Sequence, residues 1–380
     1  MNKEMSLEKI QSYTEKIRSS LEKESITPLE RFIGYQVHHT EVDHLPVWAY
    51  WRGGYTRYLT GYKLSEITTN PGMLCETILA GLSRFRFDTV WPYPDVYSLE
   101  PEAYGCTVEY LEDAHTIVKE PVINDVEDLN SIELIDPKKD GRLPLVLKVI
   151  ETLHNAIGDS HPILGHLQGP ASLAASLRGS TRLLLDMKRN PELVHEIMNL
   201  AADTCVAFGK AQLDVGAIGI SMSDAFASLP TVSPQLYCEF LIPYYKRIVD
   251  SLSRLTVGGV RWHSQVGFEQ AKDPYNFIDQ ILHAGNGAIE LQEPISLNLR
   301  RVKELCVEHG AMLWVRIHTM TLARGNPDEM KKNVRRYVEE LGEGGHLLIC
   351  APISGNAKPE VIDAYIEALL EYGRMPLPVG

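Results

Sequence analysis

The chain has 380 residues, which is long for a single domain but suits one large α/β barrel. Hydrophobic residues make up 44% of the chain and charged residues 23%, so it belongs to neither the disordered nor the fibrous class of proteins. Acidic residues outnumber basic ones by 50 to 37, and the net charge of −13 excludes a dedicated nucleic-acid binder.

Other global features predict a cytoplasmic enzyme with reduced thiols. No run of about 18 apolar residues is present, so no membrane-spanning helix is expected. The first 25 residues are charged and helical in pattern, and they lack the apolar centre of a signal peptide. The six cysteines are widely scattered, which does not indicate a disulfide framework.

After a polar helix in the first 25 residues, the chain repeats one unit: a short apolar run, a polar loop, an amphipathic helix and a glycine. Apolar runs without clean alternation are typical of strands buried on both faces. Eight such runs occur in chain order, at 45–51, 87–93, 162–167, 216–222, 259–263, 287–292, 311–318 and 346–351.

The connecting helices have clear boundaries, with proline near the start and glycine past the end. Thr27-Pro28 predicts the first helix start. Ser233-Pro234 predicts one long helix through residue 252, and three further helices end before Gly285, Gly310 and Gly342. Alternating strands and helices indicate parallel βαβ units.

We therefore expect a single-domain (β/α)₈ barrel of the α/β class over residues 27–380, preceded by a helical extension over residues 1–26. No glycine-rich phosphate fingerprint follows the first strand, which disfavours a dinucleotide-binding fold. The acidic, irregular region 105–145 is interpreted as an excursion within the barrel.

Barrel chemistry sits at the C-terminal ends of the strands, and four metal-ligand types occur there on successive strands. They are His263, Glu290, His318 and Cys350. Imidazole, carboxylate and thiolate all bind zinc, so the pattern predicts a divalent metal held by some of these residues. Each has an alternative: a core histidine, a polar wall residue, an ion pair of Glu290 with Arg316, or a buried small hydrophobic cysteine.

Polar residues at other strand ends are further candidates. Asp95 follows WPYP and could act as a general acid or orient a substrate, whereas an N-cap or turn aspartate is the alternative. Asp224 after GISMS faces the same choice. Arg52 could bind a substrate carboxylate bidentately, with a surface arginine as the alternative. His166 closes the third strand, and tryptophans such as Trp51 and Trp91 are core residues that could also line a pocket for a flat substrate.

Several segments together resemble the uroporphyrinogen decarboxylase superfamily. They are LPVWAYWRGGY, FRFDTVWPYPDVYSLEPEAYGCTVEY, GPASLAASLRG and SPQLYCEFLIPYYKRIV, and the resemblance covers roughly residues 27–370. It implies a (β/α)₈ barrel with its site at the strand C-termini. Decarboxylases of this superfamily hold their substrate with paired arginines after the first strand, where this chain has only Arg52 followed by Gly53-Gly54-Tyr55. The change disfavours porphyrinogen decarboxylation, although Asp95 lies within a residue of the decarboxylases' catalytic aspartate.

EAYGCTVEY and GRLPLVLKVIETL are more similar to the corrinoid-dependent methyltransferases of the superfamily. Thiol-methylating members bind zinc through His-x-Cys at the fifth strand and a cysteine near the eighth. Here the first motif is His263-Ser264-Gln265, and the position of the second cysteine corresponds approximately to Ser354. A zinc site with fewer thiolates carries more positive charge, which suits polarisation of a neutral oxygen.

The resemblance thus implies transfer of methyl from a methoxylated aromatic compound to the cob(I)amide of a partner corrinoid protein. The metal, or an acid such as Asp95 or His318, would pull on the ether oxygen. Aromatic residues would clamp the ring, namely Trp51, Tyr55, Trp91 and Tyr93. The alternatives are methyl transfer to a thiol or pterin, decarboxylation of a smaller substrate, and a non-catalytic binding subunit. The oligomeric state is left open, with a homodimer as one alternative.

Overall fold

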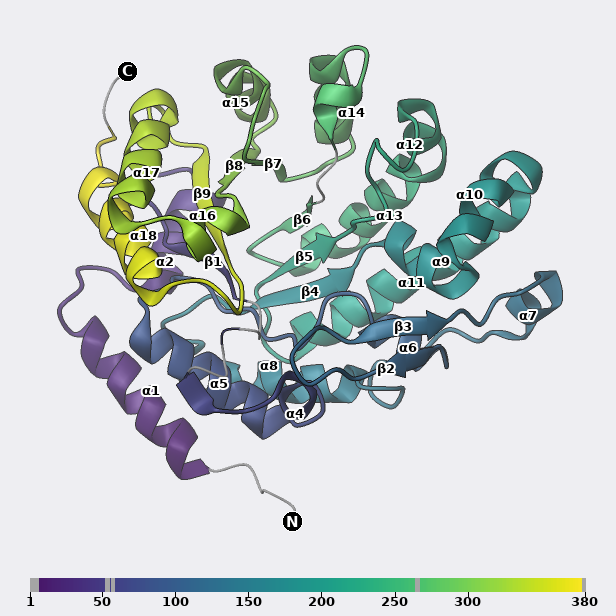
Figure 1. Cartoon of the computed structure of the whole chain (residues 1–380), viewed down its shortest axis with the longest axis horizontal. Helices are drawn as coiled ribbons and strands as arrows, with labels where there is room; N and C mark the ends of the chain where they lie inside the picture. Colours follow the sequence, from purple (N-terminus) through teal and green to yellow (C-terminus); the bar gives the residue numbers. More distant parts are fainter. Residues whose placement is uncertain (1–6, 52–54, 56–58, 264–266, 378–380) are drawn as a thin grey trace.

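The computed structural model describes residues 7–51, 55, 59–263 and 267–377. Short parallel strands form an inner ring, and helices surround it on the outside (Figure 1). The strands of the ring are β1 Trp48–Trp51, β4 Leu164–Gln168, β5 Gly219–Ser223, β6 Val260–His263, β7 Ala288–Gln292, β8 Met312–Arg316 and β9 Leu347–Ile353. The predicted (β/α)₈ barrel is confirmed.

Backbone pairing joins these strands into two arcs, one in the order β1-β9-β8-β7 and the other β4-β5-β6. The predicted second strand is reduced to a single parallel bridge between Val90 and Ile163, just before β4. On its other side the Asp88 N–H donates to the Val47 carbonyl, just before β1, at 2.9 Å. This short segment therefore closes the ring between β1 and β4.

A side-chain amide joins β6 to the region before β7. The Asn286 Nδ2 donates to the Trp262 carbonyl at 3.0 Å, and the Asn286 Oδ1 accepts from the Trp262 N–H at 3.1 Å. Asn286 is buried. Its amide thus satisfies both backbone groups of Trp262, as a neighbouring strand would.

Alternation along the strands decides which side chains enter the barrel. Trp262 stacks on Tyr245 of the outer layer with ring centroids 4.8 Å apart, so it faces the helices. Its neighbour Arg261 faces the interior, where its guanidinium lies 5.9 Å from the Trp314 ring. Burial lowers the pKa of Arg261 to about 10.

Most helices of the chain cover the barrel from outside, and several shorter ones lie in the loops. Their bounds are α1 Leu7–Leu21, α2 Pro28–Phe32, η1 Ile33–Val37, α4 Leu64–Ile67, α5 Pro71–Arg84, α6 Leu99–Ala103, α7 Val126–Ser131, α8 Leu143–Ile157, α9 Pro170–Arg178, α10 Ser180–Arg189, α11 Pro191–Asp214, α12 Pro234–Phe240, α13 Ile242–Leu252, η3 Ser253–Leu255, η4 Phe268–Gln270, α14 Pro274–His283, α15 Leu299–Glu308, α16 Thr319–Arg324, α17 Pro327–Leu341 and α18 Pro359–Tyr372. The predicted ends before Gly285, Gly310 and Gly342 agree with α14, α15 and α17 to within two residues.

The long helix predicted from Ser233 to residue 252 is wrong in one respect, because the structure divides it into α12 and α13. Ser233 caps α12 as expected, accepting from the Leu236 N–H. Pro243 lies in the first turn of α13. Proline has no N–H and clashes with the preceding turn, so it kinks or breaks a helix, and here the chain starts a new helix at Ile242.

The region 105–145 is an excursion between the second strand position and β4, as predicted. It contains an antiparallel hairpin, β2 Thr107–Glu109 and β3 Ile117–Glu120, followed by α7. Figure 1 shows the hairpin and α7 extending from one side of the barrel.

The N-terminal helix α1 packs against α5 and α8 on the outside of the barrel (Figure 1). Its Lys9 Nζ lies 2.7 Å from the Glu76 carboxylate of α5. Next along the chain, the fully buried Arg31 pairs with Glu24, Asp43 and Asp88. Ion pairs therefore link the predicted extension to the barrel.

Two global expectations can be compared with the structure. No helix among the described residues is long and apolar enough to cross a membrane. All six cysteines are free, which confirms the absence of a disulfide framework.

Candidate active site

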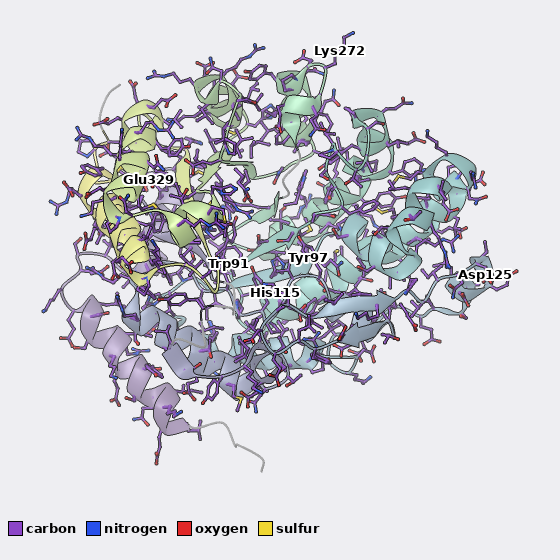
Figure 2. The ribbon with its side chains drawn as sticks, viewed as in Figure 1. Trp91, Tyr97, His115, Asp125, Lys272 and Glu329 are labelled. Atoms are coloured by element: carbon purple, nitrogen blue, oxygen red, sulfur yellow. The ribbon has the colours of Figure 1, made fainter. Side chains whose placement is uncertain are left out.

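Two hollows lie at the C-terminal ends of the barrel strands. One, of about 350 Å³, is lined at the end of β7 by Glu290, Gln292 and Glu293. The other, of about 590 Å³, is lined by Tyr97, by Gln168 at the end of β4 and by residues of the β3 hairpin strand. Parallel-strand barrels carry their chemistry at this end. Figure 2 labels Trp91 and Tyr97 toward the middle of the ring of helices.

Aromatic side chains form a row along the inner wall from β1 to β4. The ring centroids of Tyr50 and Trp91 are 5.2 Å apart, those of Trp91 and Tyr93 6.0 Å, and those of Tyr93 and His166 3.9 Å. Such edge-to-face and stacked contacts hold the rings rigidly. Three predicted substrate-binding residues, Trp91, Tyr93 and His166, are thus brought together. We call Tyr50, Trp91, Tyr93 and His166 the aromatic row.

A polar cluster inside the barrel contains two of the predicted metal ligands, Glu290 and Cys350. The Arg316 guanidinium lies 2.8 Å from one Glu290 oxygen, and the Tyr50 hydroxyl donates to the other at 3.4 Å. The Cys350 Sγ lies 3.6 Å from the Val315 carbonyl oxygen. Burial, and then the negative charge of Glu290, raise the pKa of the Cys350 thiol well above its usual value.

These donors do not fit a zinc ion as they are arranged. Glu290 is already paired with Arg316, and the Cys350 Sγ contacts the Val315 carbonyl oxygen. Within the described parts of the chain, no group of three close metal-ligating atoms includes Glu290, His318 or Cys350. Because the side chain of His263 lies outside the described residues, zinc ligation through it stays a prediction.

His318 lies two residues beyond the end of β8, where it caps α16. Its Nδ1 accepts from the Met320 N–H at 3.1 Å, so the neutral ring carries its proton on Nε2. The backbone N–H of His318 donates to a Glu293 carboxylate oxygen at 3.0 Å, and Glu293 lines the hollow at β7. The half-buried imidazole therefore offers an N–H donor near the mouth.

Asp95 is buried, and its carboxylate is fully engaged. One oxygen lies 2.8 Å from the Arg142 guanidinium, and the other accepts from the Ser98 N–H and hydroxyl at 3.0 and 2.6 Å. Arg142 also pairs with Glu102. This network anchors the turn before α6, whose N-cap is Ser98, so Asp95 has the contacts of a turn aspartate.

Asp224 is likewise held by a helix N-terminus. Its carboxylate accepts from the Ala171 N–H at 2.9 Å and the Ser172 N–H at 2.8 Å in the first turn of α9. The Tyr245 hydroxyl donates to it at 2.6 Å. Asp224 is fully buried, and burial raises its pKa despite these donors. The arrangement links β5 to α9 and α13.

The remaining predicted residues follow the first strand. Arg52 and the side chain of Trp51 lie outside the described residues, so their predicted roles are not tested. Tyr55 is buried with its ring 5.8 Å from that of Phe85, at the C-terminal end of α5. Tyr55 therefore packs toward the outer helices.

Two polar residues escaped the sequence reasoning. The Gln168 Oε1 is buried without a hydrogen-bond partner among the described residues, and Gln168 lines the hollow at β4. Behind it, Glu100 accepts from the Gln168 N–H at 2.9 Å, and burial raises the pKa of Glu100 to about 7. Gln168 follows His166 at the end of a predicted strand, and this position could have marked it as a site residue. Glu100 lies in α6 among ordinary helix residues, so nothing in the sequence indicated its role.

Sequence comparison matches residues 27–372 to the family described as "Uroporphyrinogen decarboxylase (URO-D)". Among curated relatives, the uroporphyrinogen decarboxylase of Pseudoalteromonas translucida is 26% identical over 349 residues, covering 87% of this chain and 94% of that protein. That of Psychromonas ingrahamii is 27% identical over 359 residues, with coverage of 87% and 94%.

Among solved structures, a methyltransferase from Methanosarcina mazei is similar, with a TM-score of 0.78 and 21% identity over 92% of this chain and 99% of that one. A B12-independent methionine synthase from Shewanella has a TM-score of 0.50 and 12% identity, covering 78% and 86% of the two chains. At these identities the structural likeness shows the fold. The family match spans nearly the whole barrel, and the chain belongs to the uroporphyrinogen decarboxylase family.

Proposed function

We propose that this barrel is a corrinoid-dependent methyltransferase that takes methyl from a methoxylated aromatic compound. The observation that carries the proposal is the aromatic row, whose four rings run along the inner wall from β1 to β4. Such a wall suits a flat substrate of low charge, because stacked rings supply area and orientation without an ionic partner.

The charges of the site support the same choice. Arg142 is paired with Asp95 and Glu102, and Arg316 is paired with Glu290. Neither guanidinium is left to hold the carboxylates of a polyanionic tetrapyrrole, which would need unpaired cations for bidentate contacts. The methyltransferase from Methanosarcina mazei, which shares the fold, adds to this reading.

In the proposed reaction, the carbon–oxygen bond of the methoxy group breaks and both electrons stay on oxygen. The partner's cob(I)amide supplies the nucleophile that accepts the methyl group. His318 Nε2–H donates a hydrogen bond to the leaving oxygen, which departs as a phenolate and takes its proton from solvent to give a phenol. The aromatic row orients the ring.

The mouth must accept a substrate and a partner at once. The hollows at β7 and β4, of about 350 and 590 Å³, offer space at this end of the barrel. No step is assigned to zinc, since Glu290 is paired with Arg316 and no group of three close metal-ligating atoms among the described residues includes Glu290 or Cys350.

The direct test is incubation of the purified chain with cob(I)alamin and a methoxyphenol, followed by the absorbance of methylcobalamin and by chromatography of the phenol. We expect both products in equal amounts. A phenol without methylcobalamin, or neither product across a panel of methoxyphenols with a corrinoid protein present, would exclude the proposal.

Decarboxylation is the second candidate, because the curated relatives at 24–27% identity are named uroporphyrinogen decarboxylase. The same protein incubated with uroporphyrinogen is expected to release no carbon dioxide. Release at a rate above that of heat-inactivated protein would favour this candidate instead.

A further inference from the structure

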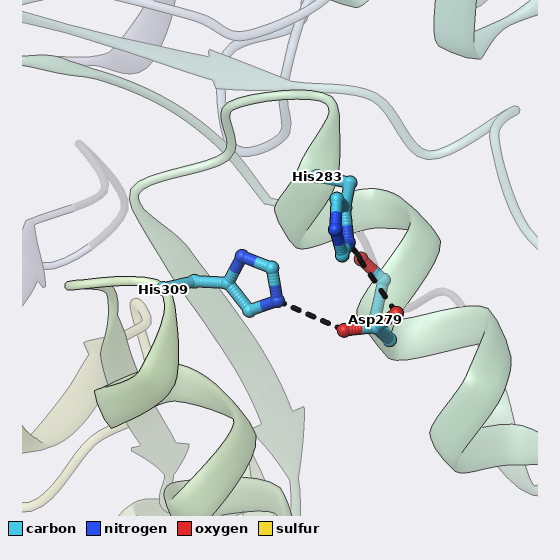
Figure 3. Close-up of side chains that lie close together, drawn as sticks. All are labelled: Asp279, His283 and His309. Carbon is cyan, nitrogen blue, oxygen red and sulfur yellow. Dashed lines mark hydrogen bonds and ion pairs between the residues drawn. The ribbon is translucent and has the colours of Figure 1, made fainter.

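A second group of metal-ligating side chains lies far from the mouth, between two outer helices. Asp279 and His283 are four residues apart on α14, and His309 follows the last residue of α15 (Figure 3). The chain enters β7 and β8 shortly after these helix ends. The group therefore lies at the N-terminal end of the barrel, opposite the candidate active site.

The two imidazoles lie close to the Asp279 carboxylate. The His309 Nε2 lies 2.8 Å from one Asp279 carboxylate oxygen, and the His283 Nδ1 lies 3.3 Å from the other. One ligand atom from each residue lies within 4.8 Å of the others. Tetrahedral zinc with bonds of roughly 2.0–2.1 Å places its ligand atoms about 3.3 Å apart, so small side-chain rotations bring all three onto one ion.

The local field favours a cation. His283 is the last residue of α14 and His309 is the C-cap of α15, so the negative ends of two helix dipoles meet here. Asp279 adds a full negative charge, and the chain as a whole carries −13. No lysine or arginine pairs with Asp279 among the described residues; its ion-pair partners there are the two histidines.

We propose that Asp279, His283 and His309 bind a divalent transition-metal ion, zinc being the best match, which ties α14 to α15. Two imidazole nitrogens and one carboxylate oxygen are ligand types that zinc takes. His283 is 68% exposed and His309 19% exposed, so the ion reaches the site from solvent and water completes its coordination.

Bound metal stabilises the folded chain, because the site is assembled only when α14 and α15 are packed together. The two ligands on α14 share one helix face by their spacing, whereas His309 comes from 26 residues further along. A metal ion bound by all three residues would therefore cross-link α14 and α15.

The test is titration of the chelator-treated full-length chain with Zn²⁺ by isothermal calorimetry, with the shift in melting temperature measured in parallel. We expect one micromolar binding event and a higher melting temperature. In the double variant His283→Ala/His309→Ala, this event should weaken by roughly 100-fold or more, since even outer partners of metal ligands change affinity about 10–100-fold. The variant Asp279→Asn, which keeps the shape of the side chain, should also bind Zn²⁺ more weakly than the unaltered chain.

The exposed His38 provides a matched control, and His38→Ala should bind Zn²⁺ as the unaltered chain does. Circular dichroism without metal establishes that each variant is folded. Co²⁺ supplies a second readout, because its visible absorption when bound should disappear in the double variant. The proposal is overturned if the unaltered chain binds no Zn²⁺, or if the isotherm and the thermal shift persist unchanged in both variants.

Discussion

The carboxylate of Glu290 and the guanidinium of Arg316 lie 2.8 Å apart inside the barrel, on the neighbouring strands β7 and β8. Replacing Arg316 with methionine leaves Glu290 as a buried uncompensated charge, which typically costs about 3–5 kcal/mol. We expect urea denaturation of Arg316→Met to show a loss of this size. The double variant Glu290→Gln/Arg316→Met should recover much of it, and equal losses in the two variants would contradict this account.

His318 has two separable roles, which an asparagine substitution distinguishes. Asparagine is a good N-cap residue, so His318→Asn should retain the start of α16 and keep the free energy of unfolding within about 1 kcal/mol. It removes the Nε2–H that stabilises the leaving oxygen, and kcat for methyl transfer should fall about 100- to 1000-fold. Unchanged kcat in the methylcobalamin assay would remove His318 from the mechanism.

The aromatic row should act on substrate binding. Tyr93 stacks on His166 at 3.9 Å, and Tyr93→Leu removes this ordered surface. An aromatic pair contributes about 0.5–1.5 kcal/mol, so KM for a methoxyphenol should rise up to roughly tenfold. Tyr372 on the outer helix α18 is the control, and Tyr372→Leu should leave KM unchanged. The same rise in both variants would indicate a general defect in folding.

Glu100 makes stability depend on pH. Burial raises its pKa in the folded chain from 4.5 to about 7, so folding favours its protonated form. The loss of folding free energy from ionising buried Glu100 is absent below pH 4.5, grows as the pH rises, and is complete above about pH 7. It corresponds to about 3 kcal/mol at roughly 1.36 kcal/mol per pH unit.

The substitution Glu100→Gln keeps an oxygen that can accept from the Gln168 N–H and removes the charge. It should stabilise the chain more at pH 8 than at pH 5, as measured by urea denaturation. His161, whose pKa burial lowers to about 4, acts in the opposite direction but equally in both proteins. Equal effects of the substitution at the two pH values would refute the raised pKa.

The barrel could be predicted because its signals are local. Proline and glycine delimit the helices, and buried strands leave uninterrupted apolar runs, so the predicted strand positions lie on or beside those of the structure. Pro243 shows where local reading failed, since the apolar spacing continued through a residue that ends a helix.

The site was less predictable, because its contacts join residues far apart in the chain. Asp224 accepts from Ala171 and Ser172, and Asp95 pairs with Arg142, so their carboxylates are anchored by partners that sequence spacing does not reveal. Glu290 and Cys350 do lie in one cluster, yet Arg316 occupies the place expected for a cation. The sequence of β8 does not show whether Glu290 binds a metal ion or pairs with Arg316.

The ion pairs and hydrogen bonds of Arg31 determine where the N-terminus can be truncated without loss of stability. The family match starts at residue 27, yet the guanidinium of Arg31 draws on the Glu24 carboxylate and the Ile26 carbonyl upstream of that boundary. A truncated chain starting at Thr27 would leave a deeply enclosed cation short of two acceptors and uncover the flank of α5. The evolutionary unit and the physical unit thus begin at different residues, and an expression plasmid designed from family boundaries alone would encode a weakened protein.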